Sequence, residues 1–464
     1  MRIINLIASS LILIFLLFCH IKSYYSPYRL IKGIFTYFKN TKYKIYVILF
    51  MYSICNLFYF SYIFVCLSYI FYLIFIITFP REFLKLHSRG YRLLSLALLI
   101  NCSIIFLEDK YSLILLIIYP LISLIFAHYF LLPIESIINN YYLKKAKEKI
   151  KRINPIVIGI TGSFSKTTFK MYLSHILKAK YICLYSPGNI NTLMGLTKWI
   201  NNDLSNLCEV LVLEMGIDKY HGIKKFKKLI SLDVGVLTSV GKMHISTFKT
   251  YERLLISKCE IDDLLKPQGM LFINERYNDI KKYDFKSNII FYGNNTYDEK
   301  FNKFQNEAID GALKIGKYLF INNEEMIERI KTLPNVNRRF EIKENEDMIV
   351  INDSYNINFE GVKEAIRFIE KYKRTSIVIT GGLIELGKYF YEENYKLGEL
   401  FKNVDYLYLF SKDINHPIKK AYEKISNKNC ILISSFNDIK NEIKNISDKK
   451  IVLITAIKGD FFIE

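Results

Sequence analysis

The chain has 464 residues, 51% of them hydrophobic, and a formal net charge of +20. The apolar residues gather in the first third, which excludes an ordinary soluble protein and predicts a membrane region followed by a soluble part. The excess of lysine and arginine is then partly a signal of membrane orientation, so we expect no nucleic-acid partner. Eight cysteines without a CxxC pair predict neither a zinc site nor a disulfide framework.

Five membrane crossings are predicted within residues 1–142, from uncharged apolar runs that suit a hydrocarbon core of roughly 30 Å. The runs are Ile3–Phe18, a hairpin of two helices within Ile45–Phe79, the shorter Leu93–Leu107, and Tyr111–Leu132. No small-x-small cleavage site follows the first run, so we expect it to stay as an anchor.

Basic residues predict the orientation of these helices. The loop between the first two crossings, the loop that contains Arg89 and Arg92, and the stretch from Lys144 to Arg152 are all basic, and basic loops stay in the cytoplasm. The sequence therefore predicts a multi-pass protein of a bacterial-type cytoplasmic membrane. The lipid bilayer is therefore an expected partner of the protein. We expect the soluble part to lie in the cytoplasm.

From Pro155 onward, short β-branched runs alternate with longer helical stretches, which predicts an α/β fold with parallel sheets. We expect a basic juxtamembrane linker over residues 143–154, a P-loop central domain over 155–333 and a smaller Rossmann-like domain over 334–464. The predicted strands are Ile156–Ile160, Val210–Glu214, Val234–Thr238, Met270–Asn274, Met348–Asn352, Ser376–Thr380, Tyr406–Phe410, Cys430–Ser434 and Ile451–Thr455.

The run IVIGITGSFSKTTFK, from Ile156 to Lys170, is the strongest functional signal. A strand that breaks into a Gly/Ser turn and reopens as a helix offers backbone N–H groups to phosphates, with Lys166 as counter-charge and a hydroxyl for Mg²⁺. ATP binding is therefore the first hypothesis, and an ordinary strand-to-helix turn is the alternative. Ser165 stands where the usual P-loop has a glycine for close backbone approach.

Three further residues lie where a phosphate site would need them. Glu214 ends the apolar strand VLVLE, so it is expected at the carboxyl edge of the sheet, as a Mg²⁺ ligand or a solvated acid. His244 follows the next strand and either faces the same phosphates or is simply exposed. Lys258, on the following helix, would be an ordinary solvated lysine on propensity alone.

Several short segments, taken together in chain order, resemble those of the Mur ligase family, and most of all its D-alanyl-D-alanine-adding branch. The segments are TGSFSKTT, SPGNINT, VLEMG, TSVGKMH, SKCE, FINE, NRRFE, NDSYNIN and ITGGLIELG. The resemblance runs from Pro155 to the end of the chain. It implies an ATP- and Mg²⁺-dependent ligase of cell-wall (peptidoglycan) synthesis that activates a carboxylate as an acyl phosphate and joins it to an amino acid or dipeptide.

The resemblance also implies a role for each matching residue. Nucleotide binding is implied for Thr161, Gly162, Ser163, Ser165, Lys166, Thr167, Thr168, Asn274, Arg339, Asp353, Tyr355 and Asn356. Two magnesium ions would be held by Thr167, Glu214, His244 and Lys258, the last as a carbamate. Catalysis is implied for Lys166, His244, Lys258 and Arg339, and contact with the acceptor substrate for Asn189, Thr192 and Asn358.

The chain departs from the family pattern in two respects. Ser165 replaces a glycine, Ser239 an asparagine and Asn352 an acid, and the segment between Tyr292 and Ala308 is shorter than expected. Membrane helices also stand where soluble members carry a UDP-binding domain, as in a membrane-attached Mur-ligase-like subgroup. The acceptor is therefore expected to be lipid-linked or membrane-proximal.

Two alternatives remain open at this point. One is an amino-acid-adding ligase of the poly-γ-glutamate or folylpolyglutamate type on the same scaffold. The other is a nucleotide-binding membrane scaffold that has lost catalysis, which the substitutions at Ser165 and Asn352 would permit.

Overall fold

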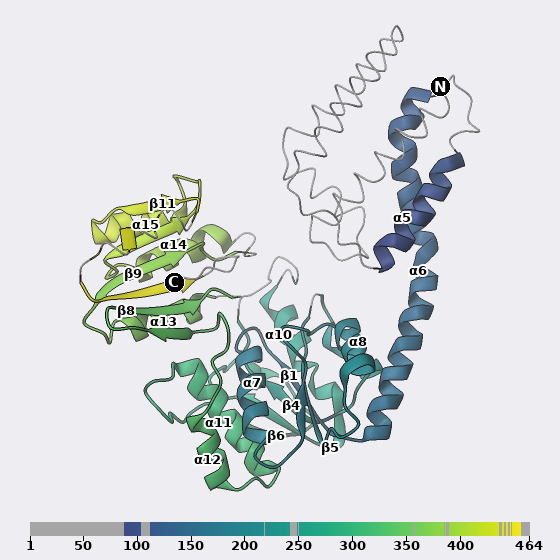
Figure 1. Ribbon diagram of the computed structural model, residues 1–464, viewed down its shortest axis with the longest axis horizontal. Helices are drawn as coiled ribbons and strands as arrows, with labels where there is room; N and C mark the ends of the chain where they lie inside the picture. Colours follow the sequence, from purple (N-terminus) through teal and green to yellow (C-terminus); the bar gives the residue numbers. More distant parts are fainter. Residues whose placement is uncertain are drawn as a thin grey trace. The chain divides into compact units, whose positions relative to one another are not determined.

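The architecture comes from a computed structural model, drawn as a ribbon in Figure 1. The described residues are 88–103, 112–217, 219–241, 248, 250–355, 358–384, 386, 389–435, 439, 442–443, 446 and 448–455, with the backbone alone for 88–89 and 112–120. The predicted crossings at Ile3–Phe18 and within Ile45–Phe79 therefore lie outside the described residues, as do the site residues His244 and Asn356.

Two helices are described within the predicted membrane region, and both differ from their predicted bounds. Helix α5 is Ser88–Asn101, so it contains Arg89 and Arg92, which were expected in a loop. Its 14 residues measure about 21 Å, less than a hydrocarbon core. Arg92 pairs with Glu135 on the second helix, 2.6 Å away, and this ion pair explains why an arginine is accommodated in α5.

Helix α6, Ser112–Ile153, is 42 residues long and continues well past the predicted end at Leu132. Residues 143–153, expected as a linker, are its last turns. The helix continues because lysine, glutamate and alanine favour helix and because Leu143, Ala146 and Ile150 provide an apolar stripe that packs in the core of the soluble part. Lys149 adds hydrogen bonds to the carbonyls of Ile200 and Asn201.

One helical segment among the described residues, Leu121–Ile153, is long and apolar enough to cross a membrane. A second, Gly90–Asn101, is apolar but shorter. The five-helix bundle thus stays a prediction for the membrane region.

The first sheet has six parallel strands in the order β2-β3-β1-β4-β5-β6. The strands are β1 (Ile156–Thr161), β2 (Cys183–Tyr185), β3 (Val210–Glu214), β4 (Leu232–Leu237), β5 (Leu265–Asn274) and β6 (Asn288–Tyr292). Its helices are α7 (Lys166–Leu177), α8 (Leu193–Asp203), α10 (Tyr251–Cys259), α11 (Lys303–Tyr318) and α12 (Asn323–Lys331), with 3₁₀ turns η3 (Ile223–Lys228), η4 (Asp262–Leu264) and η5 (Ile280–Lys282).

Strand β1 is central, so both of its faces are buried and alternate residues enter different cores. Val157 packs with α8, η3 and the end of α6, whereas Ile158 and Ile160 pack with α7 and α11. Because β1 lies between β3 and β4, the carboxyl ends of three neighbouring strands meet at one edge, where Ile160 is in register with Glu214. That edge holds the candidate site.

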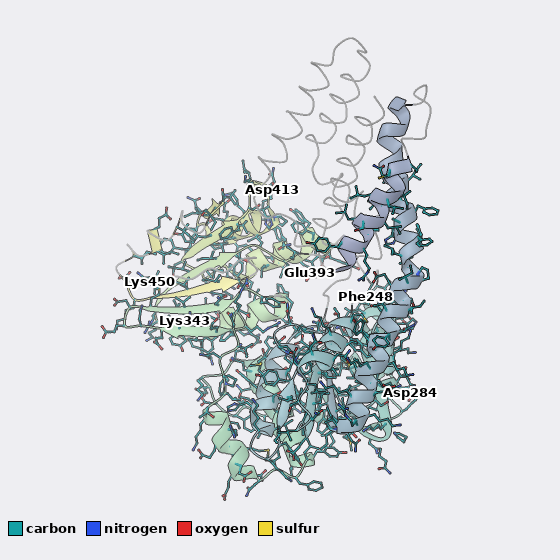
Figure 2. All side chains as sticks on the ribbon, turned by 45° about the vertical axis from the view of Figure 1, so that its right-hand side comes forward. Phe248, Asp284, Lys343, Glu393, Asp413 and Lys450 are labelled. Atoms are coloured by element: carbon teal, nitrogen blue, oxygen red, sulfur yellow. The ribbon has the colours of Figure 1, made fainter. Side chains whose placement is uncertain are left out.

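Among the described residues, the second sheet has six strands in the order β11-β10-β9-β12-β8-β7, and of these only β7 is antiparallel. The strands are β7 (Glu341–Glu344), β8 (Met348–Asp353), β9 (Thr375–Thr380), β10 (Tyr406–Phe410), β11 (Cys430–Ile433) and β12 (Lys450–Thr455). The helices α13 (Phe359–Ile369), α14 (Phe390–Leu400) and α15 (Pro417–Ser426) pack on one face. Figure 2 shows Lys343 on the edge strand β7 and Lys450 at the start of β12.

All nine predicted strands are present, with β4 and β5 beginning two and five residues earlier than predicted. Three strands were not predicted: β2, β6 and β7. Each of the three lies at the edge of its sheet and has three to five residues. Such short edge strands lack the long apolar run that identifies a buried strand.

Candidate nucleotide and metal site

The loop between β1 and α7 is held in place by the end of the neighbouring strand β4. The N–H of Ser163 donates to the carbonyl of Ser239 at 2.8 Å, and the N–H of Phe164 donates to the Ser239 hydroxyl at 2.8 Å. Gly162 has φ of +155°, and a Cβ added there would lie 2.0 Å from the Thr238 hydroxyl. The loop therefore requires glycine at position 162, and Ser239 holds the loop backbone through two hydrogen bonds.

Ser165 is the residue before α7 and has a left-handed backbone, with φ of 63° and ψ of 1°. This conformation explains why glycine is usual there, since a Cβ makes it unfavourable. We expect Ser165→Gly to raise the free energy of unfolding of the nucleotide-free protein by about 1 kcal/mol.

Denaturation of the full-length protein in detergent measures this effect. The control is Ser205→Gly, at an exposed position without a positive φ, which should be neutral or slightly destabilising. A Ser165→Gly variant no more stable than wild type would show that the left-handed turn carries no strain.

Lys166 lies across the phosphate loop. Its Nζ donates to the carbonyl oxygens of Gly162 and Ser163 at 2.9 and 3.1 Å. Burial lowers the pKa of Lys166 to about 8, although Glu214 acts in the opposite direction. A phosphate placed in the loop would offer this ammonium a better partner than two neutral carbonyls do.

Thr167 and Glu214 are joined directly, because the Thr167 hydroxyl donates to Oε2 of Glu214 at 2.8 Å. Both side chains are buried, and Glu214 is only 2% exposed. Burial alone would raise the pKa of Glu214, but Lys166, Lys170 and Thr167 hold that pKa below its ordinary value. A hydroxyl beside an ionised carboxylate is a donor set that fits Mg²⁺, which takes one or two carboxylates and leaves its other positions to phosphates and water.

Lys258 comes from α10 and reaches the same loop. Its Nζ donates to the carbonyl oxygen of Gly162 at 2.6 Å, and the residue is 4% exposed. Burial, with Lys166 nearby, lowers the pKa of Lys258 well below its ordinary value. Propensity alone would make Lys258 a solvated lysine, but its side chain is buried at the site. Burial thus favours the neutral amine, which is the form that reacts with CO₂ to give a carbamate.

The second magnesium site cannot be traced in the part of the chain that the structure describes. No group of three or more His, Cys, Asp and Glu side chains suited to a metal lies within that part, and His244 falls outside it.

Two residues that sequence reasoning missed also contact Glu214. Lys170, on α7, has its Nζ 3.2 Å from Glu214 Oε2, and the Nδ2 of Asn191 is 3.4 Å from Oε1. Lys170 lies four residues after Lys166, which puts both on one face of the helix, and this spacing was the available signal.

Residues from the start of the second sheet meet the phosphate loop at a small cavity of about 60 Å³. Arg339, Asp353 and Tyr355 line it together with Ser165 and Thr168. The guanidinium of Arg339 lies 4.5 Å from the centre of the Tyr355 ring. The expected C-terminal nucleotide residues are thus brought to the loop, apart from Asn356, which is not described.

Burial raises the pKa of Asp353 to about 6, although Arg339 acts to lower it. A carboxyl whose pKa rises on folding binds its proton more tightly in the folded state, so the contribution of Asp353 to stability is fully present below pH 4 and is lost as the pH rises through 6. We expect Asp353→Asn to stabilise the nucleotide-free protein at pH 7.5, on the order of 2 kcal/mol, and to make little difference at pH 4.

Melting temperatures of the full-length protein across pH 4–8 test this prediction. The matched control is Asp347→Asn, at an exposed turn in the same domain. A stability difference that does not depend on pH would contradict the raised pKa.

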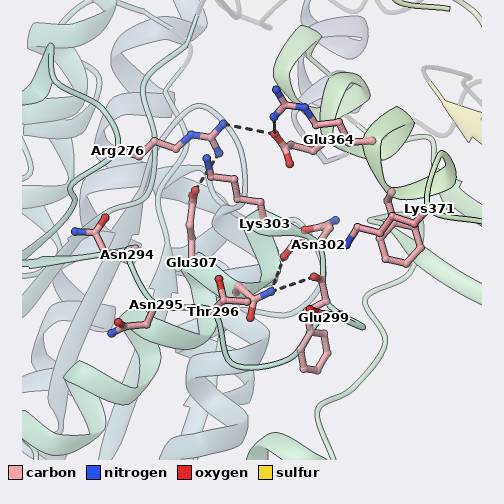
Figure 3. Close-up of a pocket in the computed structure, with 15 residues that line it drawn as sticks. Arg276, Asn294, Asn295, Thr296, Glu299, Asn302, Lys303, Glu307, Glu364 and Lys371 are labelled. Carbon is pink, nitrogen blue, oxygen red and sulfur yellow. Dashed lines mark hydrogen bonds and ion pairs between the residues drawn. The ribbon is translucent and has the colours of Figure 1, made fainter. Parts of the chain in front are cut away.

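A larger cavity of about 530 Å³ lies beside the start of α11 and is lined in part by the short segment after Tyr292. Figure 3 shows Arg276 between Glu307 and Glu364; its Nη1 is 2.9 Å from Glu307 and its Nη2 is 3.8 Å from Glu364. Asn274, expected in an adenine pocket, donates to Glu307 at 2.8 Å instead of presenting a free amide. Sequence reasoning missed Arg276 and Glu307, since neither belongs to a quoted motif position.

The other expected residues have structural hydrogen bonds. The Thr161 hydroxyl donates to the carbonyl of Met215, and the side chains of Thr192 and Asn358 cap the N-termini of α8 and α13. Their side-chain oxygens therefore already have partners. Asn189 donates to the hydroxyl of Tyr355, which links the PGNINT loop to the second sheet.

Comparisons with known proteins match both sheets of the soluble part. Residues 160–337 match the family described as Mur ligase middle domain, and residues 338–457 match the one described as Mur ligase, glutamate ligase domain. The two matches meet between residues 337 and 338.

Among relatives, the UDP-N-acetylmuramoyl-tripeptide D-alanyl-D-alanine ligase of Bacillus subtilis is 27% identical over 274 residues, 52% of this chain and 59% of that protein. The ligase of the same name from Buchnera aphidicola (subsp. Baizongia pistaciae) is 25% identical over 65% of this chain and 72% of its own length. The chain thus spans only 59% of the first of these relatives.

Among solved structures, the MurF ligase of Thermotoga maritima in complex with ADP superposes with a TM-score of 0.60 at 26% identity. The match covers 68% of this chain and 80% of that one.

Proposed function

Because this chain belongs to the Mur ligase family, we propose that it is an ATP-dependent ligase that joins an amino acid or dipeptide to a carboxylate of a peptidoglycan precursor. The observation that supports this most is the hydrogen bond between Thr167 and Glu214 beside the phosphate loop. The ammonium of Lys166 contacts the same loop through the carbonyl of Gly162. Hydroxyl, carboxylate and ammonium are the three groups that phosphoryl transfer needs in one place.

The proposed reaction has two steps. A carboxylate oxygen of the acceptor attacks the γ-phosphorus of ATP, the bond to the bridging oxygen breaks, and ADP leaves. The amine nitrogen of the second substrate then attacks the acyl carbon and loses a proton, and phosphate leaves. The first step is needed because a carboxylate is a poor electrophile at neutral pH.

The chain's own residues supply binding and orientation for these steps. The ammonium of Lys166 would hold the phosphates, together with backbone N–H groups of the 162–166 loop other than those of Ser163 and Phe164, which donate to Ser239. Arg339 and Asp353, which line the cavity next to Ser165, would help to close the site and exclude water from the acyl phosphate.

Thr167 and Glu214 would hold one Mg²⁺, and we propose that His244 and a carbamate on Lys258 would hold a second. When bound, Mg²⁺ neutralises the charge that spreads over the oxygens of the transferring phosphoryl group. The buried, uncharged state favoured at Lys258 supports the carbamate, because only a neutral amine reacts with CO₂.

We further propose that the chain is attached to the cytoplasmic membrane and acts there on a lipid-linked or membrane-proximal acceptor. The apolar segment Leu121–Ile153 supports this, as do the apolar runs of the first 87 residues, which stand where a UDP-binding domain would be expected.

Phosphate release from ATP by the full-length protein in detergent tests the proposal. The assay uses a panel of amino acids and dipeptides, including D-alanyl-D-alanine, with either a UDP-linked or a lipid-linked muropeptide. We expect release only when a matching amine and a muropeptide are both present. No stimulation by any pair, despite ATP binding, would favour the non-catalytic scaffold, and equal use of the UDP-linked acceptor would contradict the lipid-linked one.

A further inference from the structure

Lys170 is a fully buried lysine that the proposed chemistry does not use. It lies on α7, one turn after Lys166, and is 0% exposed. Lysines are rarely buried unless they are paired, so its two contacts need an explanation. Its Nζ is 3.2 Å from Oε2 of Glu214 and donates to the carbonyl oxygen of Gly188 at 2.7 Å.

Gly188 lies in the middle of a loop, residues 186–192, whose two ends are bonded to the end of β3. At the start, the N–H of Glu214 donates to the hydroxyl of Ser186 at 3.2 Å. At the other end, the N–H of Gly216 donates to the carbonyl of Asn191 at 2.7 Å. Lys170 is thus the described contact that holds the middle of the loop to Glu214.

We propose that Lys170 is a positioning residue that fixes the 186–192 loop against Glu214, and so aligns the acceptor carboxylate with the phosphoryl group. The alignment rests on the proposed function, because that function assigns the acceptor to this loop. The anchoring of the loop does not depend on it.

The chemistry of lysine suits this task. An ammonium has three donors on one atom, so it can bind a carboxylate and a carbonyl that lie in different directions. Because the group is buried, water and salt screen the ion pair little. A loop that is already ordered loses less freedom when substrate binds, and small errors in alignment reduce the rate strongly.

The residue after Gly188 connects the anchored loop to the second sheet. Asn189 donates to the hydroxyl of Tyr355, whose ring lies under Arg339. Lys170 therefore also steadies the position from which the second sheet contacts this loop.

Hydrogen exchange of the full-length protein in detergent, followed by mass spectrometry, tests the anchoring. Lys170→Met keeps the length of the side chain and removes its charge. We expect peptides that cover 186–192 to exchange at least tenfold faster, while those of β1 and β4 stay unchanged and ADP binding changes by less than threefold. Lys198→Met, an exposed lysine on α8, is the matched control and should exchange like wild type.

If Lys170→Met fails to fold, a second variant tests the anchoring of the 186–192 loop. Gly188→Ala leaves the ammonium and the carboxylate in place, and no atom of the described residues lies within 4 Å of the added Cβ. It acts through the φ of +52°, which a side chain disfavours, and should loosen the same loop selectively. Unchanged exchange of the loop in a folded variant, or exchange that rises throughout the first sheet, would overturn the proposal.

Kinetics test the alignment, with the lipid-linked muropeptide and D-alanyl-D-alanine as probes. The KM for the muropeptide should rise at least tenfold in Lys170→Met, and the KM for ATP should change less than twofold. If the variant loosened the loop selectively but the wild-type protein ligated no substrate pair, the proposed function would be refuted. The inference that Lys170 anchors the loop would still stand. An active ligase whose variant keeps a wild-type muropeptide KM would refute the alignment alone.

Discussion

Replacing Lys166 with methionine should lower ATP-dependent phosphate release by about 10²–10³-fold, because methionine fills the same space without a charge to neutralise the transferring phosphoryl group. Glu214→Gln should have an effect of similar size for a different reason. Glutamine can still accept the hydrogen bond from Thr167, but it lacks the negative charge that a bound Mg²⁺ requires. Steady-state phosphate release at saturating ATP measures both losses.

The control is Lys178→Met, because Lys178 is an exposed lysine at the C-terminal end of the same helix. Its phosphate release should match that of wild type. If Lys166→Met or Glu214→Gln kept the wild-type rate, the loop would not be the site of phosphoryl transfer. If both abolished release but the protein kept its function in the cell, the chain would be acting as a scaffold rather than as an enzyme.

Replacing Lys258 with alanine should reduce ligation by about 10²-fold, because it removes the amine that is proposed to become an anionic metal ligand. In the wild-type protein, ¹³C-bicarbonate should label this amine and give one carbamate signal by NMR. Burial keeps the pKa of Lys258 well below its ordinary value, which favours the reactive neutral amine over the ammonium. The signal should weaken as the pH falls and the amine becomes protonated.

Lys286→Ala is the matched control for this experiment. Lys286 is exposed and pairs only weakly with Asp263 at 3.6 Å, so the variant should keep both the carbamate signal and the activity. A carbamate signal that survives in Lys258→Ala would assign the modification to another lysine. Full activity without any carbamate would show that the second metal, if it binds, does not need this ligand.

Much of the fold could be predicted because its signals are local. Apolar runs of five or six residues bounded by turns identified every strand that is buried on both faces, including β1, β3 and β12. The phosphate loop followed from its glycine, lysine and threonine, and Glu214 followed from its place at a strand end. Thr192 and Asn358 could have been recognised as helix caps. Each is followed three residues later by a glycine, and the N–H of that glycine donates a hydrogen bond to the side-chain oxygen of the cap residue.

The predicted membrane region shows a limit of the same reasoning. Hydropathy located the apolar part of α6 but not its end, because a helix continues wherever its residues favour helix and find something to pack against. Ala146 and Ile150 found that partner in the core of the first sheet. The pairing of Arg92 with Glu135, which puts an arginine inside α5 rather than in a loop, likewise depends on residues 43 positions apart.

The order of strands and turn residues determined which polar groups reach the carboxyl edge of the first sheet, because parallel topology brings strand ends together there. Only the tertiary structure decided which of those groups are already bonded to protein. Lys170 is an ordinary helix lysine in the sequence, and it is buried because Gly188 and Glu214 arrive from distant segments to meet it. Asn274 is engaged by Glu307 in the same way. Satisfying a buried polar atom requires a partner of matching geometry, and the chain supplies such partners only once it has folded.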